Sequence, residues 1–188
     1  MDDRNGRKEM FENDMITVSK AKMAEYSDVE RFFCEMIDSM RDAEFKPEWE
    51  MGVYPTELLL RNAIQAQTLY LVHLKNRLVG VMVLNHDYES DYDKATWQLD
   101  LKKDEVMCIH LLGVLPSYHG RGIAKQMVSH AAQLCRREGA KAIRLDVLHK
   151  NIPAAKLYES AGFQHIDTIK MYYEDTGLTD FLLYELVL

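Results

Sequence analysis

Residues Leu111 to Ala124 read LLGVLPSYHGRGIA, an apolar run that breaks into a glycine-rich turn and continues into a helix-forming segment. Gly120 and Gly122 lack a Cβ atom where the backbone must turn sharply and approach a ligand closely. The helix that follows presents free N–H groups and a partial positive charge at its start. The stretch therefore predicts a strand, an anion-binding loop and a helix, an arrangement that binds phosphate.

Two common phosphate motifs do not fit these residues. A Walker loop requires Gly-Lys-Ser/Thr, whereas Gly122 is followed by Ile123 and Ala124. A dinucleotide fingerprint requires a third glycine, and position 125 is a lysine. The stretch resembles instead the acyl-CoA loop of the GCN5-related N-acetyltransferase (GNAT) family, Arg/Gln-x-x-Gly-x-Gly/Ala, over His119 to Ala124, with a histidine at the first position.

A second segment, about thirty residues further on, resembles the same family. The family pattern Asn-x-x-Ala-x-x-Leu-Tyr-x-x-x-Gly-Phe is matched by Asn151, Ala154, Leu157-Tyr158 and Gly162-Phe163, after a strand that ends in Leu145-Asp146-Val147. Two motifs at the family's usual separation are far more specific than either alone. The resemblance covers Met15 to Leu188.

The resemblance implies an α/β (mixed α+β) fold of the GNAT type. We expect a central, mostly antiparallel, twisted sheet of six to seven strands, flanked by about four helices, with a V-shaped splay between the fourth and fifth strands. Residues 1–14 are expected to form a flexible tail, and residues 15–188 a single N-acetyltransferase domain.

Periodicity and turn signals place the individual elements. A capping box at Ser27-Asp28-Val29-Glu30 is expected to open a helix that ends within 41–45, and Thr56 to start the second helix. The other expected helices span 122–138 and 152–161, and the expected strands span 15–19, 68–74, 77–85, 105–114, 141–148, 163–173 and 181–188.

Composition restricts the class of protein and its partners. The net charge of −7 argues against nucleic acid as the main partner and favours a basic ligand. The apolar runs are shorter than the ~18 residues of a membrane span, and the N-terminus lacks a signal core. Cys34, Cys108 and Cys135 lie far apart in apolar segments and are expected to be buried thiols of a reducing compartment. We therefore expect a cytoplasmic protein without membrane or nucleic-acid binding.

Residues 86–104 are rich in aspartate and tyrosine. A calcium loop starting at Asp87 would need Gly at its sixth position and Glu at its twelfth, where the chain has Tyr92 and Gln98. No metal site is indicated, because the histidines show no ligand spacing with carboxylates or cysteines. The segment is either a solvated loop or a rim that attracts a cationic amine.

The resemblance also implies the residues that hold the acyl-CoA. Backbone groups of Leu112, Gly113 and Val114 would pair with the pantetheine arm. Asn151 would either hydrogen-bond the arm or cap the helix that follows it, since asparagine is a preferred cap. The diphosphate would lie on a loop whose Arg121 either adds charge or is simply solvated; the loop residues are His119, Gly120, Arg121, Gly122, Ile123 and Ala124.

Direct transfer of an acetyl group to an amine needs an acid and a base. Tyr158 is placed to protonate the departing CoA thiolate, unless its ring only packs beside the cofactor. An alkyl ammonium has a pKa of about 10.4 and must lose a proton before it attacks. His110 and Glu105, in the strand expected at 105–114, are the candidate bases, and ordered water or backbone is the alternative.

The predicted function is an acyl-CoA-dependent N-acyltransferase, which transfers acetyl from acetyl-CoA, as co-substrate, to a small-molecule or peptide amine. Segments 45–68 and 86–104 are expected to form the acceptor cleft, with Trp49, Met51 and Tyr54 as either loop anchors or pocket walls. A non-catalytic acyl-CoA sensor and a protein-interaction module are the alternatives, and a homodimer stays open.

Overall fold

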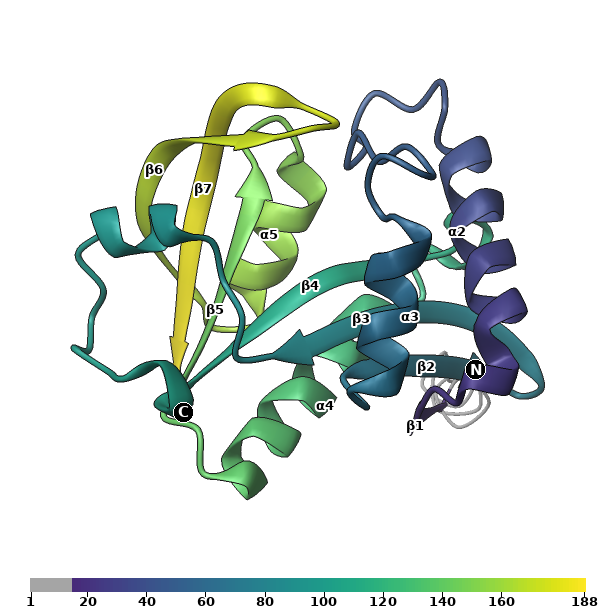
Figure 1. Ribbon diagram of the computed structural model, residues 1–188, viewed down its shortest axis with the longest axis horizontal. Helices are drawn as coiled ribbons and strands as arrows, with labels where there is room; N and C mark the ends of the chain where they lie inside the picture. The colour runs from purple at the N-terminus through teal and green to yellow at the C-terminus, as the bar shows by residue number, and fades with distance from the viewer. Residues whose placement is uncertain (1–14) are drawn as a thin grey trace, which may run out of the picture.

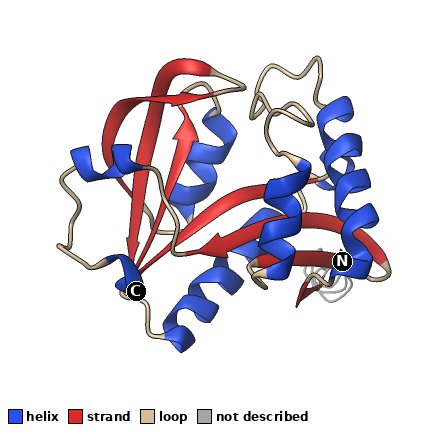
Figure 2. Cartoon of the chain, in the orientation of Figure 1, coloured by secondary structure: helices blue, strands red, loops and turns tan. Residues whose placement is uncertain are grey.

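The computed structural model describes residues 15–188, and the tail expected at 1–14 lies outside this range. One mixed sheet runs through the molecule, with helices on both faces (Figures 1 and 2). The elements are β1 (Ile16–Lys20), η1 (Met23–Glu25), α2 (Tyr26–Ser39), α3 (Glu57–Gln65), β2 (Leu69–Leu74), β3 (Arg77–Asn85), η2 (Ser90–Lys94), η3 (Lys103–Glu105), β4 (Val106–Val114), η4 (Pro116–Tyr118), α4 (Ile123–Glu138), β5 (Ala142–Leu148), α5 (Ile152–Ser160), β6 (Gln164–Tyr173) and β7 (Gly177–Val187).

The seven strands lie in the order β1-β2-β3-β4-β5-β7-β6, and only β4 and β5 run parallel. Val106–Cys108 of β4 pair with Ala142–Arg144 of β5, and we call this the paired end. Beyond Cys108 no residue of the described chain continues that pairing, and the two strands diverge, as Figure 1 shows. We call this part, residues 109–114 of β4 and 145–148 of β5, the open end. The expected fold and its splay between the fourth and fifth strands are confirmed.

Side-chain alternation in the strands separates the core into layers. Leu69, Leu71, Val81 and Val83 face α2 and α3. Val72, Met82 and Leu84 face α4 on the opposite side. A third cluster joins β5 to β7 with Tyr92, so the connection from β3 to β4 covers that half of the sheet. The core therefore supports both halves of the splayed sheet.

Three expectations from the sequence are wrong in detail. Helix α2 begins at Tyr26, and the carboxylate of Glu25 accepts the backbone N–H of Lys22 at 2.8 Å, so the helix does not start at a capping box on Ser27. It ends at Ser39, before the expected range. Strand β7 begins at Gly177, because Tyr173 already pairs with Gly177 across a short turn.

The cysteines are not all buried, which corrects a further expectation. Cys34 is exposed, because it lies one position past Phe33 on the outer side of α2. Cys108 and Cys135 are buried as expected, and burial raises the pKa of Cys135 to about 12.

Residues 15–188 contain neither a helix that could span a membrane nor a cluster of metal-ligating side chains. None of the helices there has the length and hydropathy that crossing a bilayer requires. The same residues contain no group of three or more His, Cys, Asp or Glu side chains placed to hold a metal ion.

Candidate active site

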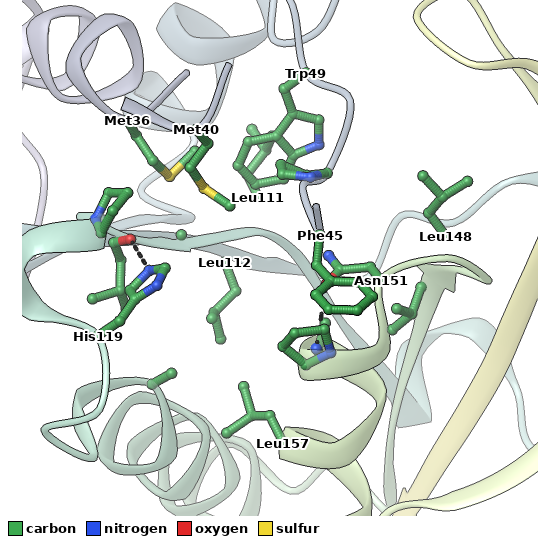
Figure 3. Close-up of a pocket in the computed structure, with 18 of the residues that line it drawn as sticks. Met36, Met40, Phe45, Trp49, Leu111, Leu112, His119, Leu148, Asn151 and Leu157 are labelled. Atoms are coloured by element: carbon green, nitrogen blue, oxygen red, sulfur yellow. Dashed lines mark hydrogen bonds between the residues drawn. The ribbon is translucent and has the colours of Figure 1, made fainter. Parts of the chain in front are cut away.

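A cavity of about 770 Å³ lies at the open end of the sheet. Its walls come from α2 and the segment after it, β4, the loop before α4, the end of β5, α5 and the β6–β7 turn. Figure 3 shows Met36, Met40 and Trp49 on one side of this space, with Leu157 across from them and Leu112 between. The divergence of β4 and β5 therefore creates the space that the sequence predicted for the cofactor.

A bulge in β4 turns its edge toward this cavity. Val81 of β3 lies opposite Gly113 and Val83 opposite His110, so β4 has one extra residue in between. Leu111 takes a φ of +50°, which is unusual for a branched side chain. A bulge bends its strand and leaves a residue unpaired. Leu112, Gly113 and Val114 line the cavity, with an edge that β5 does not cover.

Gly113 also allows close packing behind this edge. A Cβ atom added there would lie 2.6 Å from Sδ of Met36, far inside van der Waals contact. A residue with a Cβ atom at this position would therefore require the flexible end of the Met36 side chain to shift.

The loop before α4 has the features of an anion site. Gly120 and Gly122 have φ values of +76° and +74°, in the left-handed region that favours glycine. The first helical hydrogen bond runs from Gln126 N–H to Gly122 O, so the amides of Ile123 and Ala124 lack an acceptor within the helix. The first turn has no acidic residue, and both amides belong to residues of the cavity wall. The positive end of α4 therefore faces the cavity.

His119 and Arg121 differ in how they contribute to this loop. The Nε2–H of His119 donates to the carbonyl of Val114 at 2.8 Å, so the histidine ties the loop to the end of β4 (Figure 3). The guanidinium of Arg121 lies 5.4 Å from the ring centroid of Tyr118, and Arg121 is not among the residues of the wall. Lys125, which the sequence reasoning did not select, does line the cavity.

Asn151 caps α5 and lies at the cavity wall. Its Oδ1 accepts the N–H of Ala154 at 3.3 Å, which confirms the capping role. The side-chain NH₂ group remains as a donor on the cavity side.

Tyr158 projects from α5 into the same wall and is only 7% exposed. Its ring lies against Phe163, with centroids 5.4 Å apart. Burial, and then the charge of Asp146, raises the pKa of the phenol above its usual value. The hydroxyl therefore stays protonated at neutral pH, in the form that a proton donor needs.

Of the two predicted bases, the structure brings only His110 to the cavity. Its Nε2–H donates to the carbonyl of Asp87 at 2.8 Å, and Nδ1 remains as an acceptor in the neutral ring. Glu105 lies beside the paired end, where it forms an ion pair with Lys141 and accepts the backbone N–H of Lys102. These contacts hold the pKa of Glu105 below its usual value and keep it away from the cavity wall.

Asp146 is a cavity residue to which the sequence reasoning gave no role. Its Oδ1 accepts the hydroxyl of Tyr92 at 2.7 Å and that of Tyr173 at 3.4 Å. Burial raises the pKa of Asp146, while the hydrogen bond from Tyr92 and the charge of His110 act in the opposite direction. One signal was available, because a carboxylate inside a mostly apolar, buried strand requires partners or a function.

The comparisons with known proteins agree with this geometry. The model of the acetyltransferase (GNAT) family matches residues 34–163. The chain belongs to the GNAT family.

Two relatives match a little over a third of this GNAT chain. RimI of Mycobacterium tuberculosis, an N-alpha-acetyltransferase, is 33% identical over 37% of this chain and 42% of its own length. N-alpha-acetyltransferase 30 of Saccharomyces cerevisiae is 36% identical over 37% of this chain and 39% of its own. The chain thus aligns with less than half the length of the curated relatives it matches.

Two solved structures share the GNAT fold over almost the whole chain. A GNAT acetyltransferase of Streptococcus agalactiae has a TM-score of 0.76, with 16% identity over 92% of this chain and 95% of that one. Arabidopsis thaliana NAA60, in complex with acetyl-CoA, has a TM-score of 0.64, with 16% identity over 93% and 99%.

Aromatic and acidic side chains form the remaining wall of this GNAT cavity. Ring centroids of Trp49 and Tyr54 lie 6.4 Å apart, and those of Tyr54 and Tyr173 lie 6.2 Å apart. Glu44 and Asp175 add carboxylates on the same side. Burial raises the pKa of Asp175, and no cationic side chain of residues 15–188 forms an ion pair with it.

Only one of the two segments expected to form the acceptor cleft contributes to the cavity wall. Trp49 packs on Phe33, with centroids 5.9 Å apart, and also lines the cavity together with Tyr54. Met51 lines a neighbouring hollow instead. No residue of 86–104 belongs to the cavity wall, so that segment is not the expected acidic rim.

Proposed function

We propose that this protein is an acetyl-CoA-dependent N-acetyltransferase that transfers the acetyl group to a primary amine by direct attack in a ternary complex. One observation carries the proposal: a single cavity is bordered by the free amides of α4, the uncovered edge of β4, the phenol of Tyr158 and the carboxylate of Asp146. The family membership and the N-acetyltransferase names of the relatives support it.

The cavity wall suits each part of acetyl-CoA. The amides of Ile123 and Ala124 and the charge of Lys125 suit the diphosphate. The edge at 112–114 suits an extended amide-containing arm, which would bind like an added strand. A volume of about 770 Å³ falls within the usual range of ligand sites, roughly 300–1,000 Å³.

Asp146 is our proposed base. The acceptor arrives as an ammonium ion, and the carboxylate takes one of its protons, so that the nitrogen lone pair can attack the thioester carbonyl. A carboxylate whose pKa is raised by burial is a stronger base than a solvated one. Asp146 therefore ranks above Glu105, which is already paired with Lys141. His110 lies in the same wall and is the second candidate.

Tyr158 is our proposed acid. As the C–N bond forms and the C–S bond breaks, its hydroxyl gives a proton to the departing sulfur. The nitrogen then loses a second proton, which restores the phenol, and the proton on Asp146 leaves to water. The products are the N-acetyl amine, CoA thiol and one released proton.

The acceptor side of the cavity favours a cationic amine. Asp146, Asp175 and Glu44 put negative charge there, and the rings of Trp49 and Tyr54 suit a cation at close range. Both a small amine and a peptide N-terminus carry the required primary ammonium group. The N-alpha-acetyltransferase relatives favour the peptide.

Release of CoA thiol tests the proposal directly. Acetyl-CoA is supplied together with amines, polyamines, amino acids, aminoglycosides or peptides, and we expect amine-dependent thiol release that is fastest for cationic acceptors. Binding of CoA without turnover on any amine would indicate a sensor. Absence of CoA binding would indicate an interaction module, and would remove the proposed function altogether.

The variant Gly122→Glu provides the matched test of the cofactor loop. Glutamate would place a carboxylate where the diphosphate is proposed to lie and would strain a backbone with φ of +74°. We expect CoA affinity to fall beyond detection by calorimetry, while the circular dichroism spectrum is unchanged. Wild-type affinity would show that the loop does not hold the cofactor.

A further inference from the structure

Tyr92 reaches Asp146 from a part of the chain that the sequence predicts to be either a solvated loop or an acidic rim. Its hydroxyl donates to Oδ1 of Asp146 at 2.7 Å, across 54 positions of sequence. The side chain is 1% exposed, although it belongs to the short helix η2 within the connection from β3 to β4. A burial this complete in a polar segment requires a reason.

Several contacts fix the ring of Tyr92 in this place. Tyr88 stacks on it with centroids 5.4 Å apart and an interplanar angle of 11°. The ring of Trp97 lies 5.3 Å away, and its indole N–H donates to the carbonyl of Tyr92 at 2.9 Å. The Tyr92 hydroxyl therefore has little freedom to leave the carboxylate.

Trp97 is in turn held by a buried ion pair. The guanidinium of Arg144 lies 4.2 Å from the Trp97 ring centroid, and its Nε donates to Glu185 at 2.9 Å. Arg144 also donates to the carbonyl of Leu99 at 3.0 Å. The ion pair thus anchors the connection from β3 to β4 on the strand that carries Asp146, two residues beyond Arg144.

Among the described residues, no other hydrogen-bond partner explains why the Tyr92 ring carries a hydroxyl group. Phenylalanine would supply the same ring to the same cluster, without the cost of burying a polar group. The only side chain that gains from the hydroxyl, among those described, is Asp146.

We propose that Tyr92 is a positioning residue for acetyl transfer, whose hydroxyl holds the carboxylate of Asp146 toward the acceptor amine. This inference rests on the proposed role of Asp146 as the base. A hydrogen bond to the charged form stabilises it, so Tyr92 also opposes the effect of burial and keeps the base ionised at lower pH.

The pH dependence of Asp146 involves every titratable group around it. Tyr173 of β6 donates the second, longer hydrogen bond at 3.4 Å. The charge of His110 favours the carboxylate. The charge of Asp146 in turn raises the pKa values of four phenols and one thiol around it: Tyr54, Tyr92, Cys108, Tyr158 and Tyr173.

The test compares Tyr92→Phe with Tyr88→Phe, which removes one phenol from the same stack but no hydrogen bond to Asp146. In Tyr92→Phe we expect the acid limb of kcat/KM to move upward by roughly one pH unit, the effect of one lost hydrogen bond to a charged group. KM for acetyl-CoA should stay within two-fold. Tyr88→Phe should keep the wild-type profile.

An unchanged acid limb in folded Tyr92→Phe would overturn the inference. A measurement on the wild-type protein covers the case in which the variant does not fold. The ¹³Cζ shift of Tyr92 should titrate with the same midpoint as the acid limb of kcat/KM, and absence of that inflection would also overturn the inference.

Asp146→Asn separates this inference from the function on which it rests. If Asp146→Asn keeps wild-type activity, the proposed base is wrong, and Tyr92 then has no base to position. If Asp146→Asn is inactive but Tyr92→Phe has the wild-type profile, only the role of Tyr92 fails.

Discussion

Carboxylates at the paired end and at the open end of β4 and β5 have different kinds of partners. At the paired end, Glu105 forms an ion pair with Lys141, and Glu185 of β7 pairs with Arg144 of β5. At the open end, Asp146 has hydroxyl groups as its hydrogen-bond donors instead of a lysine or arginine. Carboxylates beside the paired end therefore have cationic partners in ion pairs, whereas the side-chain donors to the carboxylate of β5 at the open end are hydroxyl groups.

This difference shows how strand divergence changes the surroundings of a carboxylate. Where β4 and β5 pair, neighbouring side chains are close enough to supply a cation. Where the strands separate, the Asp146 carboxylate is buried beside a cavity, and its charged form loses solvation without an ion pair to a lysine or arginine of the described residues. The pKa of Glu105 is lowered and that of Asp146 is raised, which agrees with a structural role for the first and with the proposed chemical role of the second.

The largest expected effect contrasts one carboxylate from each end. Asp146→Asn should lower kcat/KM by about 10²- to 10⁴-fold, the usual contribution of general base catalysis. Glu105→Gln removes an exposed ion pair and should change kcat/KM by no more than about two-fold. Steady-state kinetics with saturating acetyl-CoA measures both.

Equal losses of kcat/KM in Asp146→Asn and Glu105→Gln would contradict the distinction between the two ends. His110→Gln serves as the second comparison, because His110 lines the same cavity. A loss in His110→Gln as large as that expected for Asp146→Asn, with Asp146→Asn near wild type, would transfer the role of base to the histidine.

Tyr158→Phe tests the other partner at the open end. The change keeps the ring that packs on Phe163 and removes the proton donor. Burial raises the pKa of the Tyr158 phenol and so makes it a weaker acid. We therefore expect kcat to fall by about 10²-fold, near the lower limit of the usual contribution of acid catalysis. Affinity for CoA, measured by calorimetry, should stay within a few-fold. Wild-type kcat, with chemistry as the limiting step, would reduce Tyr158 to a packing residue.

The local features of the site could be predicted from the sequence. The glycine turn at 120 and 122, the cap at Asn151 and a helix start within one residue of the predicted position 122 depend on neighbours within a few positions, and the structure has all of them. Family resemblance added the splay between β4 and β5, which no local pattern specifies.

Long-range partners could not be predicted in the same way. Glu105 looked like a candidate base because its partner Lys141 is 36 positions away, on the neighbouring strand. Asp146 was given no role because the two phenols that contact it are distant in sequence. Tyr92 is separated from Asp146 by 54 positions and Tyr173 by 27 positions. Cys34 is exposed although its neighbour in α2 is buried. The apolar character of a segment alone does not determine which of its residues face the solvent.

The smallest expected effect concerns stability, and its sign differs between the two ends. The folded-state pKa of Asp146 lies above its unfolded value, so ionisation costs more in the folded chain, and the wild-type protein loses stability as pH rises through the folded pKa. Asparagine can still accept from Tyr92 and carries no charge. Asp146→Asn should therefore raise Tm by about 2–4 °C at pH 7.5, the shift that about 1 kcal/mol produces in a protein of this size.

The pH dependence of this gain makes the comparison specific. As pH falls below the folded pKa, the difference in Tm between wild type and Asp146→Asn should shrink, and it should vanish below the unfolded pKa, where the carboxyl is protonated in both states. Glu105 has a lowered folded pKa, so its contribution to stability is present above the unfolded pKa and is lost as pH falls. Glu105→Gln should thus lower Tm slightly at pH 7.5 and not at acidic pH. Scanning calorimetry from pH 4 to 8 measures both variants, and a lower Tm for Asp146→Asn at pH 7.5 would mean that the charged carboxylate stabilises the open end.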